Sequence, residues 1–334
     1  MEKHLTFDLL SQLPSHHYLK THGAAITIRM LLSHTSGVPN PPPLDWFFVE
    51  ETDTSSSLDE KRQEAFYNVL KRSPQLKFAP GSDQLYSNVG YWILEKVIEN
   101  VTGKPYADVL LEQIALPLGF GDSCSRKGSP KLTFELPCDD GSEHKSRGFL
   151  ARGHSPRFSL QTFILYLLTP KTYWSALNNQ RWSAFNRLIP HGMGYGGMHA
   201  SVEGLKLVVL IDLLKEDDML VANEEESPAA TIKDSGVLLS LEPKREMFGL
   251  CNNTPLGWAK GTICINGEDQ PYLTKPGGGL GYHGNIRIYT HLGIASVFLC
   301  NGTCVSAGPI NKTSDCLDLP FLSEKLARQI KPSL

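Results

Sequence analysis

The sequence lacks a run of about 18 consecutive apolar residues, the length that a membrane-crossing helix needs, so no membrane span is expected. Residues 1–20 also lack the apolar centre of a secretory signal. As written, the chain is compatible with the cytoplasm, and export stays open if a further segment precedes Met1.

Positive charge is not in excess, because 32 Lys and Arg residues stand against 35 Asp and Glu residues, for a net charge of -3. Binding to nucleic acid depends on basic residues that contact phosphates, so a nucleic-acid partner is not expected. Hydrophobic residues at 41% and charged residues at 20% are ordinary for a globular protein with a core.

Cysteines are few, and their number, seven, is odd, so they cannot all pair. With four Asn-x-Thr sequences, they permit two interpretations: disulfides and glycans of an exported protein, or free thiols and chance matches. The second is favoured, since no export signal supports the first. Cys300 and Cys304 have no second pair of ligands nearby, so neither a metal nor a cofactor is implied.

One stretch combines a turn, a polar triplet and a helix start. Pro80 and Gly81 form the break, Tyr86-Ser87-Asn88 follows, and Ser87 or Asn88 can cap the helix that the spacing predicts up to Gly103. The triplet brings a phenol, a hydroxyl and an amide together, which suits proton transfer and substrate binding. Taken alone, the triplet favours the other interpretation, in which Tyr86 is an amphipathic residue over the core, because such triplets are frequent by accident.

The surrounding sequence distinguishes these two interpretations. The run 78–106, FAPGSDQLYSNVGYWILEKVIENVTGKPY, resembles the second signature region of the serine β-lactamase and penicillin-recognising enzymes, particularly their class C and esterase-like branch. Residues 26–37 look like the segment before it in that family, and Lys275-Pro276-Gly277 looks like its third motif.

This resemblance implies an α+β fold in one β-lactamase-related domain, with an antiparallel sheet flanked by helices and a helical lobe. The lobe is expected at about 24–215, and the C-terminal sheet with its terminal helix at about 250–331. Periodicity predicts helices at 27–32, 58–71, 88–102, 106–115, 158–168, 174–188, 201–214 and 317–330, and strands at 256–265, 281–289 and 293–300. The helices at 158–168 and 174–188 are expected to be buried, and the glycines of 190–199 are expected to permit close backbone packing.

The resemblance also assigns the chemistry. Tyr86 and Lys275 are the expected catalytic residues, Tyr86 for proton transfer and Lys275 as the cation that lowers the tyrosine pKa. The expected substrate-binding residues are Ser87, Asn88, Gly277 and Gly278. Pro276 replaces the Thr or Ser usual in the family, so a hydroxyl that binds a substrate carboxylate is absent.

The family's nucleophile motif, Ser-x-x-Lys, is expected upstream of Tyr86 and is not there. The chain's one literal match, Ser142-Glu143-His144-Lys145, follows Tyr86 in a charged, Gly-rich stretch and is interpreted as coincidence. We therefore expect the N-terminal strands and nucleophile helix to be missing. Two hypotheses follow: an ester or amide (peptide) hydrolase of small molecules that is inactive in this form, or a non-catalytic relative that binds a ligand. Oligomeric state is not predicted.

Overall fold

The computed structural model describes residues 10–50, 58–116, 134–135, 152–158, 160–178, 181–186, 188–196, 199–200, 205, 255–265, 267–279, 281–289, 292 and 294–302. The helical segments there are α2 (Tyr18–Thr21), α3 (Ile28–Leu32), α4 (Leu58–Arg72), α5 (Asn88–Thr102), α6 (Tyr106–Leu110), the π-helical turn η2 (Leu111–Ala115), α7 (Leu160–Leu168) and the 3₁₀ turn η4 (Lys171–Tyr173). The strands are β1 (Phe48–Glu50), β2 (Phe134–Glu135), β3 (His154–Pro156), β4 (Trp174–Asn178), β5 (Trp182–Phe185), β6 (Leu188–Pro190), β7 (His199–Ala200), β8 (Ala259–Ile265), β9 (Glu268–Gly279), β10 (Tyr282–Tyr289) and β11 (Ile294–Cys300).

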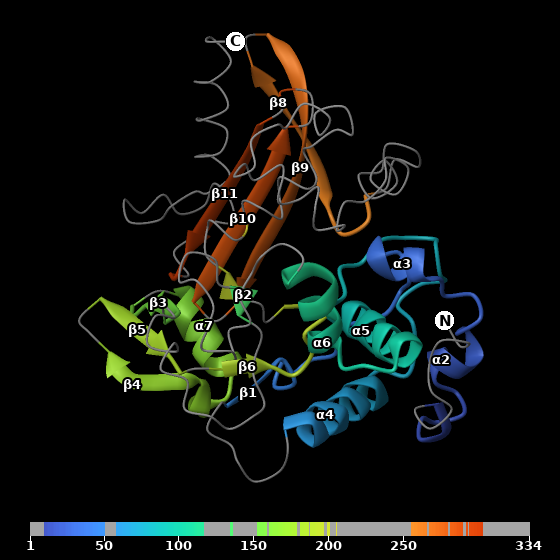
Figure 1. The fold of residues 1–334 in the computed structure, drawn as a ribbon. Coiled ribbons are helices and arrows are strands. Elements are labelled where there is room, and N and C mark those ends of the chain that lie inside the picture. Colours follow the sequence, from blue (N-terminus) through green and yellow to red (C-terminus); the bar gives the residue numbers. More distant parts are fainter. Residues whose placement is uncertain are drawn as a thin grey trace.

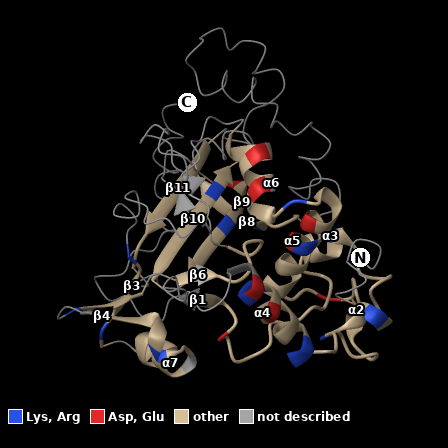
Figure 2. Cartoon of the chain, turned by 60° about the horizontal axis from the view of Figure 1, so that its bottom comes forward, with Lys and Arg blue, Asp and Glu red and all other residues tan. Residues whose placement is uncertain are grey.

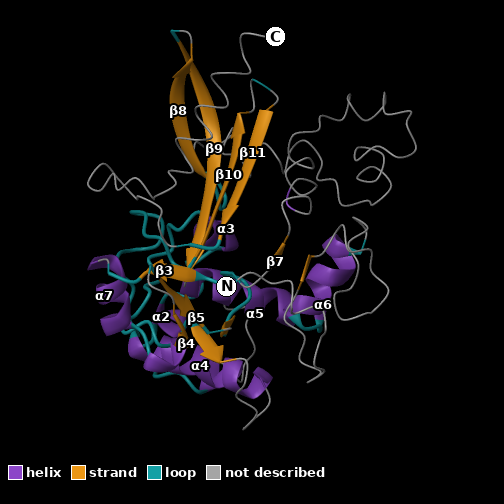
Figure 3. Ribbon diagram, turned by 90° about the vertical axis from the view of Figure 1, so that its left-hand side faces the viewer, coloured by secondary structure: helices purple, strands orange, loops and turns teal. Residues whose placement is uncertain are grey.

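The largest sheet is antiparallel, with strand order β11-β10-β9-β8. Figure 1 shows it rising above two other parts, the helices α2 to α6 on one side and a small sheet with α7 on the other. The small sheet has the order β3-β5-β4. In the side view of Figure 3, the helices gather at one end of the large sheet.

Helix α5 is defined by its own sequence. The Ser87 hydroxyl accepts a hydrogen bond from the Gly90 amide (2.8 Å) and so caps the first turn. Gly103 ends the helix in the left-handed conformation, φ 67°. The apolar face of α5 buries Trp92 and Ile93 completely against the helical core.

Aromatic rings fill that core, and two glycines allow a loop to approach it. Trp92 lies 5.1 Å from the Phe66 ring of α4, centroid to centroid. A Cβ on Gly192 would stand 2.7 Å from Trp92 Cγ, and one on Gly194 would collide with the Tyr91 carbonyl oxygen. The predicted close packing of the Gly-rich stretch is therefore confirmed at these two positions.

The long strand β9 holds two prolines although it lies between β8 and β10. Pro276 pairs with Asn285 of β10, beyond Thr274, where the pairing with β8 ends. Pro271 pairs with Thr262 of β8, beyond the last pair with β10. Each proline thus sits where β9 has one partner strand among the described residues, so its missing N–H leaves no ladder bond broken.

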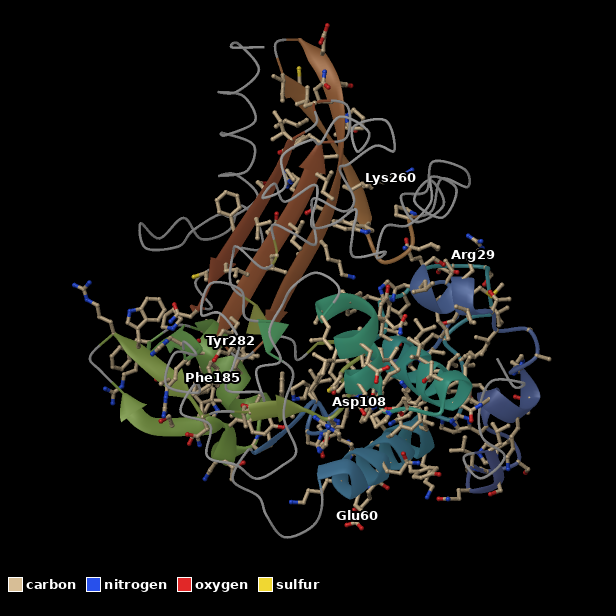
Figure 4. The ribbon with its side chains drawn as sticks, in the orientation of Figure 1. Arg29, Glu60, Asp108, Phe185, Lys260 and Tyr282 are labelled. Carbon is tan, nitrogen blue, oxygen red and sulfur yellow. The ribbon has the colours of Figure 1, made fainter. Side chains whose placement is uncertain are left out.

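The large sheet also contacts the small one. The His154 amide donates a hydrogen bond to the Gly281 carbonyl (3.3 Å), which precedes β10. Figure 4 labels Tyr282 at this end of β10, beside the strand of the small sheet that carries Phe185. The start of β10 is thereby held against the part of the molecule that includes α7.

Several predictions about elements are confirmed and some are wrong. The helices at 58–71, 88–102 and 158–168 and the three predicted strands are present, the helix at 106–115 continues from α6 into η2, and β9 is an additional strand. The helix predicted at 174–188 is wrong, because the segments there form the strands β4, β5 and β6. Strand β5 pairs with β3 and strand β6 pairs with β1, and this pairing outweighs the local helical spacing. The expected burial of 158–168 is also wrong, since most of the α7 side chains that are described are exposed. The helices predicted at 201–214 and 317–330 lie outside the described residues, apart from residue 205.

Candidate active site

Tyr86 lies immediately before the Ser87 cap of α5, and Asn40, from a loop distant in the sequence, supports its backbone. The Asn40 side-chain amide donates to the Tyr86 carbonyl (3.3 Å). The Asn40 Oδ1 accepts from the Asn88 amide (2.9 Å) and the Val89 amide (3.2 Å). Asn40 thus satisfies two amides of the first helical turn and fixes the backbone from which the Tyr86 ring extends.

His34 is the next group in the site, and its backbone is unusual. Its φ of 60° places it in the left-handed region, which non-glycine residues rarely occupy. In this conformation its carbonyl accepts from the Leu85 amide (2.8 Å), and its Nδ1 accepts from the Ser87 amide (3.1 Å). Because Nδ1 accepts, the ring proton of the neutral imidazole is on Nε2. The His34 ring lies 4.5 Å from that of Tyr86 and 5.0 Å from that of Tyr91.

Lys275 reaches the same cluster from β9. Its Nζ lies 5.3 Å from the centroid of the Tyr91 ring, a cation–π contact. The Tyr91 hydroxyl donates to the Leu32 carbonyl (3.0 Å), which also accepts from the Gly257 amide (2.9 Å). One carbonyl at the end of α3 therefore joins the helix α5 to the segment that leads into β8.

The electrostatics of the cluster are set mainly by desolvation. Burial lowers the pKa of His34 to about 4, and repulsion from Lys275 adds to the effect. Burial likewise lowers the pKa of Lys275 and, with the nearby phenols Tyr86 and Tyr106, raises the pKa of Tyr91 to about 12. At neutral pH, His34 and Tyr91 are therefore uncharged, and Lys275 is the basic side chain whose charge acts on His34.

The pKa of Tyr86 departs from its expected direction. Although its side chain is 58% exposed, partial desolvation raises the phenol pKa above the ordinary value. The expectation that Lys275 lowers it is not met, because the ammonium lies over Tyr91 and its influence falls on His34 instead. In this arrangement Tyr86 is a neutral hydrogen-bonding phenol at neutral pH.

The other predicted site residues have different surroundings. Ser87 is buried, and its hydroxyl is occupied in the helix cap. Asn88 is half-buried in the first turn of α5. Gly277 and Gly278 lie exposed on β9, and a Cβ on Gly277 would meet no atom of the described residues within 4 Å. Among these residues, nothing covers the Gly277 side of the strand that carries Lys275.

Three residues of the cluster were not assigned to it from the sequence: Asn40, Tyr91 and His34. A histidine at the end of a short helix is typical of a structural hydrogen-bonding residue, and His34 accepts the hydrogen bond from the Ser87 amide in that way. Tyr91 lies on α5 one turn after Asn88, away from the Trp92 side, so helical spacing could have indicated it. Nothing local marks Asn40, since its partners are 46 to 49 positions away.

The described residues contain no group of three or more His, Cys, Asp or Glu side chains that could hold a metal ion. They also include no helix long and apolar enough to span a membrane.

Comparison with known proteins gives matches of sequence and of fold. The profile of the family described as Beta-lactamase matches residues 6–306. Penicillin-binding protein 4* of Bacillus subtilis (strain 168) is 29% identical over 150 residues, 42% of this chain and 30% of that protein. The D-alanyl-D-alanine-carboxypeptidase/endopeptidase AmpH of Escherichia coli (strain K12) is 34% identical over 105 residues, 30% of this chain and 24% of that protein. The matched segments thus span less than a third of these relatives' own length.

Among solved structures, the D-amino acid amidase from Ochrobactrum anthropi SV3 complexed with D-phenylalanine matches with a TM-score of 0.56. The match covers 96% of this chain and 77% of the amidase, at 15% sequence identity. At that identity, the likeness concerns the fold.

Proposed function

We propose that this chain, which belongs to the beta-lactamase family, carries the tyrosine and the lysine of a serine-hydrolase site. The substrate of this site would be a small ester or amide. Its fold is β-lactamase-like, with antiparallel sheets and helices. In the proposal Tyr86 relays protons, Lys275 supplies positive charge beside the reacting carbonyl, and the open edge at Gly277 and Gly278 receives the substrate.

The observation that carries this proposal is the meeting of two distant motifs at one cluster. Tyr86 precedes α5 and Lys275 lies on β9, yet the His34 ring lies 4.5 Å from the Tyr86 ring, and repulsion from Lys275 lowers the pKa of His34. Tyr91 joins the same group, with its ring against both His34 and Lys275. A phenol and an ammonium in one cluster are suited to proton transfer and to stabilising a developing oxyanion.

Upstream of Tyr86, the 334 residues contain no Ser-x-x-Lys motif, which would carry the nucleophilic serine. Their one Ser-x-x-Lys sequence, 142–145, follows Tyr86 and lies outside the described residues. Without an acyl-accepting serine, a site of this kind keeps only the residual catalysis of binding and oxyanion stabilisation. We therefore infer that the 334 residues by themselves carry out no acyl transfer.

The test has two arms. The chain of 334 residues is assayed with nitrocefin and p-nitrophenyl acetate and is treated with a fluorophosphonate probe; we expect no turnover and no stoichiometric label. A second chain, with a Ser-x-x-Lys segment of a relative joined before Met1, is expected to gain esterase activity that Tyr86→Phe lowers by about 10²- to 10⁴-fold, the range for a lost general acid or base. A probe adduct mapped within residues 1–334 would contradict the first arm.

A second candidate function is binding without catalysis. The raised pKa of Tyr86 favours it, since a neutral phenol is a hydrogen-bond donor rather than a base. Pro276, which lacks the hydroxyl that the family uses for a substrate carboxylate, does not distinguish the two functions: it argues against recognition of a penicillin more than against hydrolysis of an ester or peptide. If the extended chain stays inactive while the 334 residues bind a D-amino acid amide in calorimetry, the binding function replaces the catalytic one.

A further inference from the structure

Helix α7 has its apolar stripe on the outside. Leu160, Phe163, Ile164 and Leu167 recur at the spacing i, i+3, i+4, i+7, which places them on one face of the helix. Their side chains are 75%, 60%, 45% and 66% exposed. In a globular protein such a stripe usually faces the core, so this one is available for contact with something apolar.

Next to this stripe, aromatic residues line a groove of about 520 Å³. Phe158, just before α7, is 88% exposed and lines the groove with Phe163, Tyr166 and Trp174. The Tyr166 and Trp174 rings lie 5.7 Å apart. Tyrosine and tryptophan combine an apolar ring with a polar group, which suits them to the boundary between hydrocarbon and water.

The sequence on either side of α7 carries charge of one sign. From 144 to 202 it contains no Asp or Glu and seven basic residues, although the whole chain carries a net charge of -3. Of these, Arg152, Arg157, Lys171 and Arg181 lie among the described residues. Arg157 and Arg181 lie together, because the Arg157 amide donates to the Arg181 carbonyl (2.8 Å). Figure 2 shows basic residues near α7 and β4, whereas acidic residues lie on α4, α5 and α6.

We propose that this surface, the α7 stripe with a basic rim formed by Arg157, Lys171 and Arg181, docks onto an anionic lipid surface. The helix would lie in the plane of the interface with Phe163 and Leu167 in the acyl boundary, and the rim would contact the headgroups. A second copy of the same face is disfavoured as the occupant, because it would set one basic rim against another. This inference is independent of the proposed hydrolase site.

The test uses the full chain and vesicles, with binding measured by co-sedimentation. We expect the chain to partition onto phosphatidylcholine vesicles containing about one-third phosphatidylserine, and at least about tenfold less onto phosphatidylcholine alone. Raising the salt to about 1 M should remove most of the difference, because the Debye length falls to about 3 Å. Phe163→Asp with Leu167→Asp, and separately Arg157→Glu with Lys171→Glu, should each lower partition onto anionic vesicles by about tenfold or more.

Matched controls separate the surface from general effects of charge. Val101→Asp changes a valine of α5 that is 65% exposed, and Lys77→Glu changes an exposed lysine near the helical core; both should partition as wild type does. If the double aspartate variant fails to fold, Lys171→Glu alone, on the exposed turn η4, replaces it, and this variant should also partition less onto anionic vesicles than wild type does. Equal partition of wild type onto both vesicles overturns the proposal, and so does a dimer in sedimentation velocity that Phe163→Asp abolishes, because the face would then join two copies of the chain.

Discussion

At the scale of single residues, His34 connects the two motifs of the candidate site. It holds the Ser87 amide through Nδ1, lies against the rings of Tyr86 and Tyr91, and is repelled by Lys275 when protonated. The hydrogen bond from Ser87 is accepted by Nδ1, and burial and the repulsion from Lys275 both disfavour the protonated ring, so this arrangement favours a neutral imidazole. The site should therefore weaken in acid, as the ring gains its proton.

The pH dependence of stability tests this. The folded-state pKa of His34, about 4, lies below its ordinary value of 6.5, so the folded state disfavours protonation of the ring. His34 therefore contributes stability above pH 6.5, and this contribution is lost as the pH falls from 6.5 towards 4. Allowing for partial exposure, we expect wild type to lose about 1 kcal/mol more than His34→Asn between pH 7.5 and 5, from urea unfolding. Asparagine keeps the left-handed backbone accessible and removes the titration.

His22→Asn, a change at an exposed histidine, serves as the control and should follow wild type. If His34→Asn and wild type lose equal stability over this range, the imidazole titrates normally and its place in the cluster is wrong.

The tyrosine pKa is a second test at this scale. With tyrosine labelled at ¹³Cζ, the resonance that disappears in Tyr86→Phe should titrate above 10 in wild type, because desolvation raises the phenol pKa. Lys275→Met should leave that midpoint above 10, since the ammonium interacts with Tyr91 and His34. A midpoint below 10 that rises in Lys275→Met would instead restore Lys275 as the group that holds the Tyr86 pKa down.

At the scale of elements, helix α5 supports the site, and the loop that contains Gly192 and Gly194 packs closely against this helix. Gly192 lies against the Trp92 ring, and Gly194 lies against the backbone of Tyr91, whose side chain enters the cluster. The Gly194 amide also donates to the buried Glu95 carboxylate (2.7 Å). A change in this loop should therefore disturb both the core and the position of Tyr91.

Gly192→Ala is expected to destabilise the fold by about 1 to 3 kcal/mol, because the new methyl group overlaps the Trp92 ring in a packed core. Gly196→Ala is the matched control: no atom of the described residues lies within 4 Å of its Cβ, so the change should stay within about 0.5 kcal/mol. Urea unfolding followed by tryptophan fluorescence measures both. Equal stability of the two variants would show that the loop moves aside without cost.

At the scale of the whole molecule, apolar exposure is concentrated rather than scattered. Among the described residues, six of the large exposed hydrophobics lie between Phe158 and Leu167, on or beside one nine-residue helix. The other exposed large hydrophobics of the described residues are spread singly or in pairs between Ile28 and Leu299, while most apolar side chains of the helical core and of the large sheet are buried. A probe of apolar surface should therefore report mainly on α7.

We expect the chain to bind anilinonaphthalene sulfonate, and Phe163→Asp with Leu167→Asp to remove more than about half of the fluorescence, since the dye follows contiguous apolar surface. Val101→Asp should change it little, although that valine is equally exposed, because it stands alone. Loss of less than about a tenth of the signal in the α7 variant would place the dye site elsewhere and contradict this distribution.

The sequence by itself determined the features that depend on neighbouring residues. The Ser87 cap, the Gly103 end of α5, the helix after Leu58 and the turn at Gly267, φ 82°, follow from contacts within a few positions of the chain. The resemblance of 78–106 and 275–277 to a known family also placed Tyr86 and Lys275 as candidates, and the family itself is confirmed. The division into a lobe at 24–215 and a sheet at 250–331 stays a prediction.

The tertiary structure alone decided the features that depend on distant segments. Residues 174–188 have helical spacing but form strands, because β3 and β1 offer partners whose hydrogen bonds outweigh local preference. The left-handed His34 and the position of Lys275 over Tyr91 arise where α3, α5 and β9 meet, and no local pattern encodes such a meeting. The same holds for α7, whose apolar stripe predicts a buried face: spacing shows which side chains share a face, but only the packing of the rest of the chain determines whether anything covers it.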